Sequence, residues 1–271
     1  MTMITSSLIG SDGTTLLLRH RPVDDPRSTI LLIHGIAEHS GRWGHVAEFF
    51  TGRGHEVWAY DHRGHGGSGG LQMHVDRFDQ FVDDLALVVD RVRADRPLVM
   101  YGQSLGGLIA AAYAESDHRA PDLLVLSAPA LGATIPKPLV AVGRLLDRVA
   151  SRTRIPAPLD GSQLSRDPAV GEAYLADPQV HLAPTARFGA AVLDAMDDVG
   201  ARLDLITVPT LVVHGGDDLL VPTAVSEPLG EVDGIERKVF AGLRHEMHNE
   251  PEATEVLGFV AEWIEGRLSG S

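Results

Sequence analysis

The sequence predicts an α/β fold in which a mostly parallel β-sheet is covered by helices on both faces. Short, continuously apolar runs recur along the chain, which is the pattern of strands buried on both faces. Segments with helical periodicity alternate with these runs, as they do in parallel sheets with crossover helices. At 271 residues and 44% hydrophobic composition, the chain can form one large domain with a substantial core.

The expected strands begin with the run TILLI at residues 29–33, which ends at His34. Further runs span residues 57–60, 98–101, 123–126, 210–213 and, in a shorter form, 238–240. Residues 78–92 carry apolar side chains at helical spacing with aspartates on the other faces, which predicts an amphipathic helix. Ligands of parallel sheets bind beyond the carboxyl ends of the strands. The polar residues at these ends are therefore expected on one rim: His34, Asp61, Ser104, Asp217 and Asp218.

The alternation stops between residues 129 and 199, where prolines and short helical segments replace it. We expect residues 129–199 to form a cap inserted into a core of residues 8–128 and 200–271. Within it, one helical face carries Leu139, Val142, Leu146 and Val149. Two interpretations of this apolar face stay open: a lid over a substrate pocket, or helices packed into the core.

Composition limits the classes of partner. The 37 acidic and 23 basic residues give a net charge of −14, which disfavours nucleic acids and anionic membrane surfaces. The absence of cysteine excludes disulfides, thiolate catalysis and cysteine–zinc sites. No apolar stretch reaches the roughly 18 residues of a membrane helix, so no integral membrane segment is predicted. Residues 1–7 lack the features of a secretion signal and look like a cloning-vector leader, which predicts a cytoplasmic protein.

Ser104 is the candidate nucleophile. It lies in GQSLG at residues 102–106, directly after the strand run 98–101 and directly before the apolar segment 108–112. Such a strand–turn–helix exposes the serine hydroxyl, and the flanking glycines leave room for the sharp turn. The second match to this pattern, GGSGG at residues 66–70, lacks the preceding strand and the following helix. Ser68 is therefore predicted to be a loop serine.

A serine nucleophile needs a base and an acid that orients the base, and in this fold class both follow the serine, acid first. The acid is expected after the strand run 210–213, where two aspartates are adjacent. The turn pattern GxxDxxVP favours Asp218, with Asp217 as the alternative. The base is expected after residues 238–240, where His245 follows the glycine turn more closely than the alternative, His248.

No metal site is predicted, because HEMH at residues 245–248 is one residue short of the zinc motif HExxH. The chemistry also requires backbone N–H groups that stabilise a developing oxyanion. One is expected from Leu105, next to the nucleophile, and the other from Ile36, in the loop after the first strand run. His34 is interpreted as a residue that shapes this loop rather than as a base.

Four segments together resemble the monoacylglycerol lipases, an α/β-hydrolase family. They are HGIAEHSGR at 34–42, DHRGHGGSG at 61–69, GQSLGG at 102–107 and LRHEMHNE at 243–250. The similarity extends from about residue 8 to residue 267 and includes the cap stretch 164–178. It implies an α/β-hydrolase fold and hydrolysis of monoglycerides through an acyl-serine intermediate, without metal or organic cofactor. The implied site is Ser104, Asp218 and His245, with Ile36 and Leu105 as oxyanion donors.

Two positions depart from the family pattern. Gln103 replaces the usual histidine, and Leu105 replaces the usual methionine. Leu105 contributes only its backbone, so the oxyanion hole is expected to survive, whereas Gln103 leaves the head-group preference open. Glu38 and Arg42 are expected either to bind the head group or to form a structural ion pair. The cap residues Leu139, Val142 and Leu146 are expected to line the acyl site.

The leading function is therefore a serine hydrolase of monoacylglycerols, whose partner is a small lipid ester and whose cap makes transient contact with lipid surfaces. A carboxylesterase that prefers short-to-medium acyl esters is the alternative within the same class. A non-catalytic binding protein on this fold is disfavoured, because such proteins usually lose a catalytic residue and all three are present here.

Overall fold

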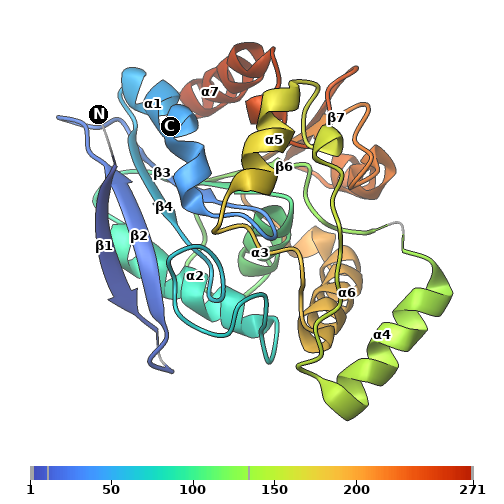
Figure 1. Cartoon of the computed structure of the whole chain (residues 1–271). Coiled ribbons are helices and arrows are strands. Elements are labelled where there is room, and N and C mark those ends of the chain that lie inside the picture. The colour runs from blue at the N-terminus through green and yellow to red at the C-terminus, as the bar shows by residue number, and fades with distance from the viewer. Residues whose placement is uncertain (1–2, 11, 134, 270–271) are drawn as a thin grey trace.

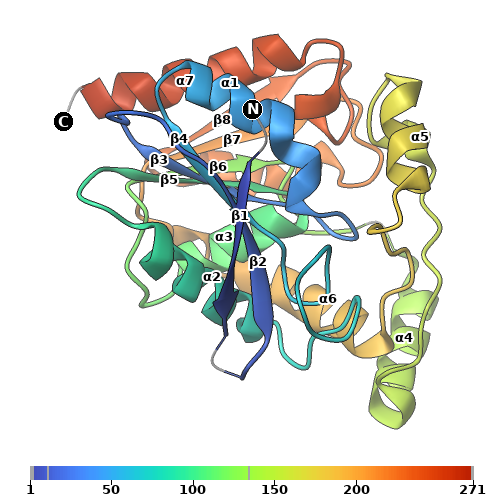
Figure 2. The ribbon, with the colours of Figure 1, turned by 60° about the vertical axis from the view of Figure 1, so that its left-hand side comes forward.

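The computed structural model describes residues 3–10, 12–133 and 135–269. Its described part contains one sheet of eight strands in the order β1-β2-β4-β3-β5-β6-β7-β8. β1 (Ile4–Ile9) and β2 (Thr15–Arg21) form the antiparallel edge, and every pair from β4 to β8 is parallel. Helices cover both faces of the sheet, which confirms the predicted fold class (Figures 1 and 2).

The parallel strands contain the six predicted apolar runs. They are β3 (Thr29–Ile33), β4 (Glu56–Tyr60), β5 (Leu98–Gln103), β6 (Leu123–Ser127), β7 (Thr210–Gly215) and β8 (Ile235–Phe240). The first five are buried at every position, whereas β8, at the sheet edge, is partly exposed. Sequence patterns missed β1 and β2. The residues set aside as a leader include the start of β1, which pairs with β2.

Successive strand residues face opposite sides of the sheet and divide the core into two clusters. Leu31 and Ile33 pack with α2 (Asp79–Val92), α3 (Leu105–Ala114) and α6 (Ala186–Gly200). Ile30 and Leu32 pack with α1 (Gly44–Gly52) and α7 (Ala253–Ser269). The two groups of helices lie on opposite faces of the sheet (Figure 2). The amphipathic helix predicted for residues 78–92 is thus α2.

The segment between β6 and β7 contains three helices with different surroundings. Thr185 precedes α6 as its N-cap, where the hydroxyl oxygen accepts a hydrogen bond from the N–H of Phe188, and the helix packs into the core. α4 (Lys137–Ala150) stands out from the body (Figure 1) and contacts α6. α5 (Pro168–Ala176) lies near the carboxyl ends of the strands, and Asp167 caps its first turn.

Two ion pairs join α4 to α6. Arg144 of α4 lies 2.7 Å from Asp194 of α6, and Arg187 of α6 lies 2.8 Å from Asp147 of α4. Short 3₁₀ helices complete the chain: η1 (Ser40–Trp43), η2 (Gly161–Gln163), η3 (Leu203–Leu205), η4 (Thr223–Ser226), η5 (Pro228–Glu231) and η6 (Met247–Asn249). None of the helices in the described ranges is long and apolar enough to cross a bilayer.

Candidate active site

Ser104 forms the turn between β5 and α3, where the sequence places it. Its backbone has φ +52° and ψ −117°, a conformation that non-glycine residues rarely adopt. The surroundings hold this strained turn. The N–H of Ser104 donates to the carbonyl of Ser127 at 3.0 Å, and its own carbonyl accepts from the N–H of Ala130 at 3.0 Å. The side chain therefore leaves the chain at the carboxyl edge of the sheet.

The glycines of GQSLG are required by close backbone contacts. A Cβ on Gly102 would lie 2.4 Å from the carbonyl oxygen of Gly106, and a Cβ on Gly106 would lie 2.1 Å from that of Ile33. Ser68 has a different surrounding. Its Oγ donates to the carbonyl of Asp61 at 2.5 Å and accepts from the N–H of Leu17 at 2.8 Å, as expected for a residue that fixes a loop.

Asp218 lies in the turn after β7, and both oxygens of its carboxylate have hydrogen-bond partners. Its Oδ1 accepts from the N–H groups of Leu220 and Val221, both at 2.9 Å, and its Oδ2 lies 2.7 Å from Nδ1 of His245. Burial alone would raise the pKa of Asp218, but hydrogen bonds from His214 and His245 hold that pKa well below its ordinary value. The carboxylate therefore stays ionised beside His245.

The two alternatives to this pair have other surroundings. Asp217 is exposed, and its N–H donates to the carbonyl of Leu243. His248 is buried, and its ring stacks on Trp43 with 4.2 Å between the ring centroids. Burial lowers the pKa of His248 to about 3, so its ring is neutral. The geometry brings together Asp218 and His245, not Asp217 and His248.

The loop of residues 35–39 passes beside Ser104 and is named the oxyanion loop, because it contains Ile36, the predicted oxyanion donor. β3 and β5 end level, with Ile33 opposite Gly102, so the chain after β3 starts next to Ser104. A Cβ on Gly35 would lie 3.4 Å from Cβ of Ser104 and 2.4 Å from Oε1 of Gln103. Ile36 follows directly and is 39% exposed. Gly35, the residue before Ile36, is therefore a close neighbour of Ser104 at the rim.

Leu105, the other predicted donor, is the first residue of α3. The N–H groups of a first helical turn have no acceptor within the helix and carry its positive end. His34 shapes the oxyanion loop from below, because its Nδ1 donates to the carbonyl of Gly35 at 2.7 Å and its Nε2 accepts from the N–H of His62 at 3.0 Å.

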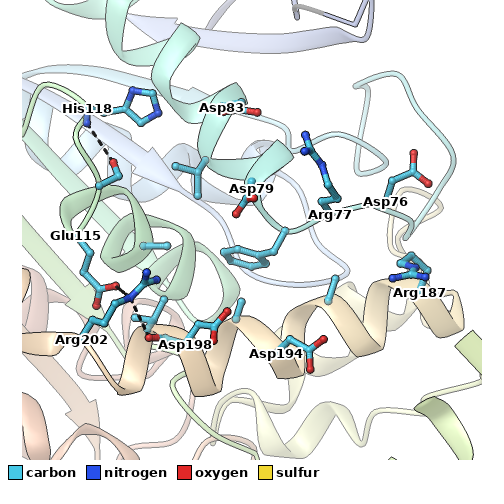
Figure 3. A pocket seen from close by; sticks show the side chains of 17 residues that line it. Asp76, Arg77, Asp79, Asp83, Glu115, His118, Arg187, Asp194, Asp198 and Arg202 are labelled. Atoms are coloured by element: carbon cyan, nitrogen blue, oxygen red, sulfur yellow. Dashed lines mark hydrogen bonds and ion pairs between the residues drawn. The ribbon is translucent and has the colours of Figure 1, made fainter. Parts of the chain in front are cut away.

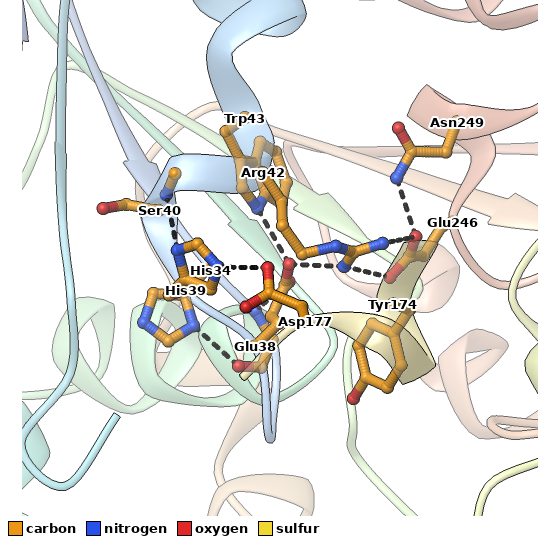
Figure 4. A network of polar contacts seen from close by, with 12 residues as sticks. His34, Glu38, His39, Ser40, Arg42, Trp43, Tyr174, Asp177, Glu246 and Asn249 are labelled. Carbon is orange, nitrogen blue, oxygen red and sulfur yellow. Dashed lines mark hydrogen bonds and ion pairs between the residues drawn. The ribbon is translucent and has the colours of Figure 1, made fainter. Parts of the chain in front are cut away.

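Of the residues predicted to bind substrate, Gln103 is buried beneath the oxyanion loop, and its Nε2 has no hydrogen-bond partner among the described residues. Glu38 and Arg42 contact each other: Nη1 of Arg42 donates to Oε2 of Glu38 at 2.7 Å. Arg42 also reaches Glu246, the residue after His245 (Figure 4). Sequence reasoning missed Glu246, whose partner is 204 positions away.

The predicted apolar cap residues lie on α4. Leu139 is 61% exposed and Val142 is 54% exposed, whereas Leu146 is half-buried. Leu145 and Val149 are exposed as well. This helix therefore presents an apolar surface that the rest of the described chain does not cover.

A pocket of about 620 Å³ lies between α2, α3 and α6 (Figure 3). It contains Glu115, whose side chain is 2% exposed and whose Oε2 lies 3.6 Å from Nε of Arg202. Burial raises the pKa of Glu115 to about 7. Glu115 follows the last residue of α3 and Ser104 precedes the first, so the length of the helix, about 15 Å, separates them. Within the described ranges, no three His, Asp or Glu side chains are grouped as metal ligands.

Known proteins resemble this chain in sequence and in fold. The family model Hydrolase_4, described as serine aminopeptidase, S33, matches residues 24–252. The chain is 39% identical over 256 residues to a monoacylglycerol lipase of Mycolicibacterium smegmatis, covering 91% of each chain. It is 32% identical over 278 residues to the monoglyceride lipase of Homo sapiens, covering 97% of this chain and 90% of the relative. The crystal structure of a Paleococcus ferrophilus monoacylglycerol lipase superposes with a TM-score of 0.83 over 100% of both chains, at 28% identity.

Proposed function

This chain belongs to the Hydrolase_4 family of serine hydrolases, and from that premise we propose that it hydrolyses monoacylglycerols to fatty acid and glycerol. We assign Ser104, Asp218 and His245 as the catalytic triad. One observation carries the proposal: His245 is bound to a buried, ionised aspartate in a chain whose strained serine turn lies at the same edge of the sheet. The relatives named monoacylglycerol lipase support the substrate class.

The mechanism follows from these positions. Nε2 of His245 takes the proton of the Ser104 hydroxyl, and Oγ attacks the ester carbonyl. The backbone N–H groups of Ile36 and Leu105 stabilise the tetrahedral oxyanion. His245 then protonates the departing glycerol, and a water that His245 activates releases the fatty acid from the acyl-serine. Asp218 remains ionised throughout and holds the ring of His245 through Nδ1, which leaves Nε2 to exchange the proton with the serine.

We assign substrate contacts to two regions. Gln103, beneath the oxyanion loop, is proposed to border the glycerol end, because it is buried next to Ser104 and has an unused amide N–H group. Residues 129–199 are proposed as a cap, in which Leu139, Val142 and Leu146 border the acyl chain. For Glu38 and Arg42, the mutual contact supports the ion-pair interpretation over direct binding of the head group.

We propose that α4 also contacts lipid aggregates. Four large apolar side chains on it are more than half exposed: Leu139, Val142, Leu145 and Val149. The net charge of −14 gives no attraction to anionic lipid, so burial of apolar area must supply the binding free energy. A cytoplasmic location and the absence of a nucleic-acid partner remain part of the same proposal.

The test is a series of monoacylglycerols of increasing chain length, together with the corresponding di- and triacylglycerols. We expect lauroylglycerol to be hydrolysed faster than butyrylglycerol, and the di- and triacylglycerols more slowly than either. A maximum at butyryl would favour the short-chain carboxylesterase. The absence of hydrolysis on every ester would favour a binding protein. The control is the variant Ser104→Ala, in which only the uncatalysed background hydrolysis should remain.

A further inference from the structure

We propose that Arg42 is a positioning residue. It fixes the oxyanion loop relative to the loop of residues 243–250, which carries His245 and is named the histidine loop. The inference rests on the proposed function, since it assigns Ile36 and His245 their roles in that reaction. It differs from binding of the glycerol head group, because Arg42 would act on the hydrolysis of any ester. Figure 4 shows Arg42 between carboxylates from the two loops.

The contact with the histidine loop is bidentate. Nη1 and Nη2 of Arg42 donate to Oε1 and Oε2 of Glu246, both at 2.7 Å. Paired N–H···O bonds of this kind fix the orientation of both planar groups as well as their distance. Glu246 is the next residue after His245, and its Oε2 also accepts from Nδ2 of Asn249 at 2.7 Å. The position of the histidine loop is therefore tied to the guanidinium.

The contact with the oxyanion loop passes through Glu38. Oε2 of Glu38 accepts from Arg42 at 2.7 Å, and Oε1 accepts from the backbone N–H of Gly35 at 2.7 Å. Gly35 directly precedes Ile36, the proposed oxyanion donor. The carboxylate of Glu38 thus connects the guanidinium to the backbone whose next N–H group must reach the substrate oxygen.

A third contact comes from the segment between β6 and β7. The guanidinium of Arg42 lies over the ring of Tyr174 in α5, 4.7 Å from its centroid. The hydroxyl of Tyr174 donates to the carbonyl of Ile36 at 3.4 Å. Arg42 therefore sits where the oxyanion loop, the histidine loop and α5 meet.

Charge balance makes Arg42 hard to replace at this position. The side chains of Arg42, Glu38 and Glu246 are 13%, 2% and 3% exposed, so a single cation lies between two buried carboxylates. Burial alone would raise the pKa of Glu246, but the hydrogen bonds and charge of Arg42 lower it to about 2. Burial keeps the pKa of Glu38 raised even beside Arg42. Without the guanidinium, the two buried carboxyl groups would lose the cation that both of them contact, and the two loops would no longer be tied to each other.

The expected consequence is a loss of rate rather than of substrate affinity. A displacement of about 1 Å in a catalytic group costs about 10²-fold in rate, and the loss of one oxyanion donor costs about 10²- to 10³-fold. Arg42→Gln removes the charge and should lower kcat by about 10²-fold. Arg42→Lys keeps the charge but cannot bond two carboxylates in the same planar geometry. It should therefore restore only part of kcat.

The experiment compares two esters of the same acid, 1-lauroylglycerol and methyl laurate, and adds the rate of labelling by a fluorophosphonate. The variants are Arg42→Gln, Arg42→Lys and Glu246→Gln. The matched control is Arg63→Lys. The side chain of Arg63 is 8% exposed, against 13% for Arg42; it bonds both oxygens of Asp84 at 2.6 and 2.7 Å, and it lies outside the proposed machinery. Thermal unfolding of every variant identifies those that fold.

A positioning role predicts that kcat falls on both esters by similar factors, with KM within about threefold, and that labelling slows in parallel. Arg63→Lys should lower the unfolding temperature without lowering kcat. A loss confined to 1-lauroylglycerol would overturn the proposal in favour of head-group binding, and an unchanged kcat in any folded Arg42 variant would also overturn it. If Arg42→Gln does not fold, kcat, KM and the labelling rate of Arg42→Lys and Glu246→Gln test the proposal in the same way. If the wild type cleaves neither ester, the proposed function fails, and the labelling rate alone still tests Arg42.

Discussion

Nδ1 of His245 lies 2.7 Å from Oδ2 of Asp218, although 27 positions separate the two residues in the chain. The sheet explains the contact, because Asp218 follows β7, His245 follows β8, and these two strands are parallel neighbours. A second contact supports the same closeness: a Cβ on Gly215 would lie only 2.2 Å from the carbonyl oxygen of Arg244. The glycine at the end of β7 therefore lets the histidine loop approach the aspartate.

The first prediction uses the adjacent aspartates as a matched pair. Asp218→Asn should lower kcat by about 10⁴-fold, because an amide neither stabilises the imidazolium nor holds the required tautomer. Asp217→Asn removes an exposed carboxylate one position away and should change kcat by less than about twofold. Steady-state kinetics on one soluble ester measures both. A larger loss in Asp217→Asn than in Asp218→Asn would reverse our choice of the acid.

The second prediction concerns the serine turn. Gly106→Ala should lower the free energy of unfolding by about 3 kcal/mol or more, because the new Cβ would lie 2.1 Å from the carbonyl oxygen of Ile33. Gly189→Ala is the control: it lies within α6, and nothing lies within 4 Å of its added Cβ. The control should be neutral or stabilising by up to about 1 kcal/mol. Urea denaturation checks both, and equal effects would contradict the close contact.

The third prediction concerns pH and Glu115. Burial, partly opposed by Arg202, raises the pKa of this carboxyl from 4.5 to about 7, so folding favours its protonated form. The associated stability is complete below pH 4.5 and is lost as the pH rises through 7. Glu115→Gln should therefore be more stable than wild type at pH 8 by about 1–2 kcal/mol after allowance for solvent screening. The difference should be much smaller at pH 5. An equal difference in denaturation experiments at both pH values would contradict the raised pKa.

The fourth prediction tests the lipid contact of α4. The double variant Leu145→Gln/Val149→Gln changes side chains that are 60% and 72% exposed. Each should lose roughly 1 kcal/mol of burial in lipid, so binding to neutral vesicles should weaken about 30-fold. Vesicle co-sedimentation measures the change. Hydrolysis of dissolved butyrylglycerol is the control and should not change. Unaltered vesicle binding would rule out α4 as the contact.

The sequence predicts the parts of this molecule that depend on local patterns. Continuous apolar runs identified the buried parallel strands, and glycine spacing located the turn at Ser104. The antiparallel strands β1 and β2 could not be predicted in this way. β1 is exposed at almost every position, and the three leucines of β2 are followed by polar and charged residues, so neither strand has the long apolar run of a strand buried on both faces. The bidentate contact between Arg42 and Glu246 could not be predicted from the sequence for another reason. Each is an ordinary charged residue in sequence, and only the folded chain brings them together.

The sequence also does not predict that α4 and α6 have different surroundings. Both helices carry apolar residues at helical spacing, and both lie in the predicted cap segment. Spacing does not indicate whether such a face packs on the sheet, as Phe188 and Val192 of α6 do, or remains exposed, as Leu139 and Val149 of α4 do. The outcome depends on which elements compete for the sheet surface.

The most direct test of the catalytic triad is the site at which a fluorophosphonate reacts. Mass spectrometry of the peptides from the labelled protein should locate one phosphonyl group on Ser104. The labelling rate should fall by orders of magnitude in His245→Ala and little in His248→Ala, whose ring stacks on Trp43 instead of binding Asp218. Labelling of a residue other than Ser104, or equal rates in the two histidine variants, would contradict the proposed triad.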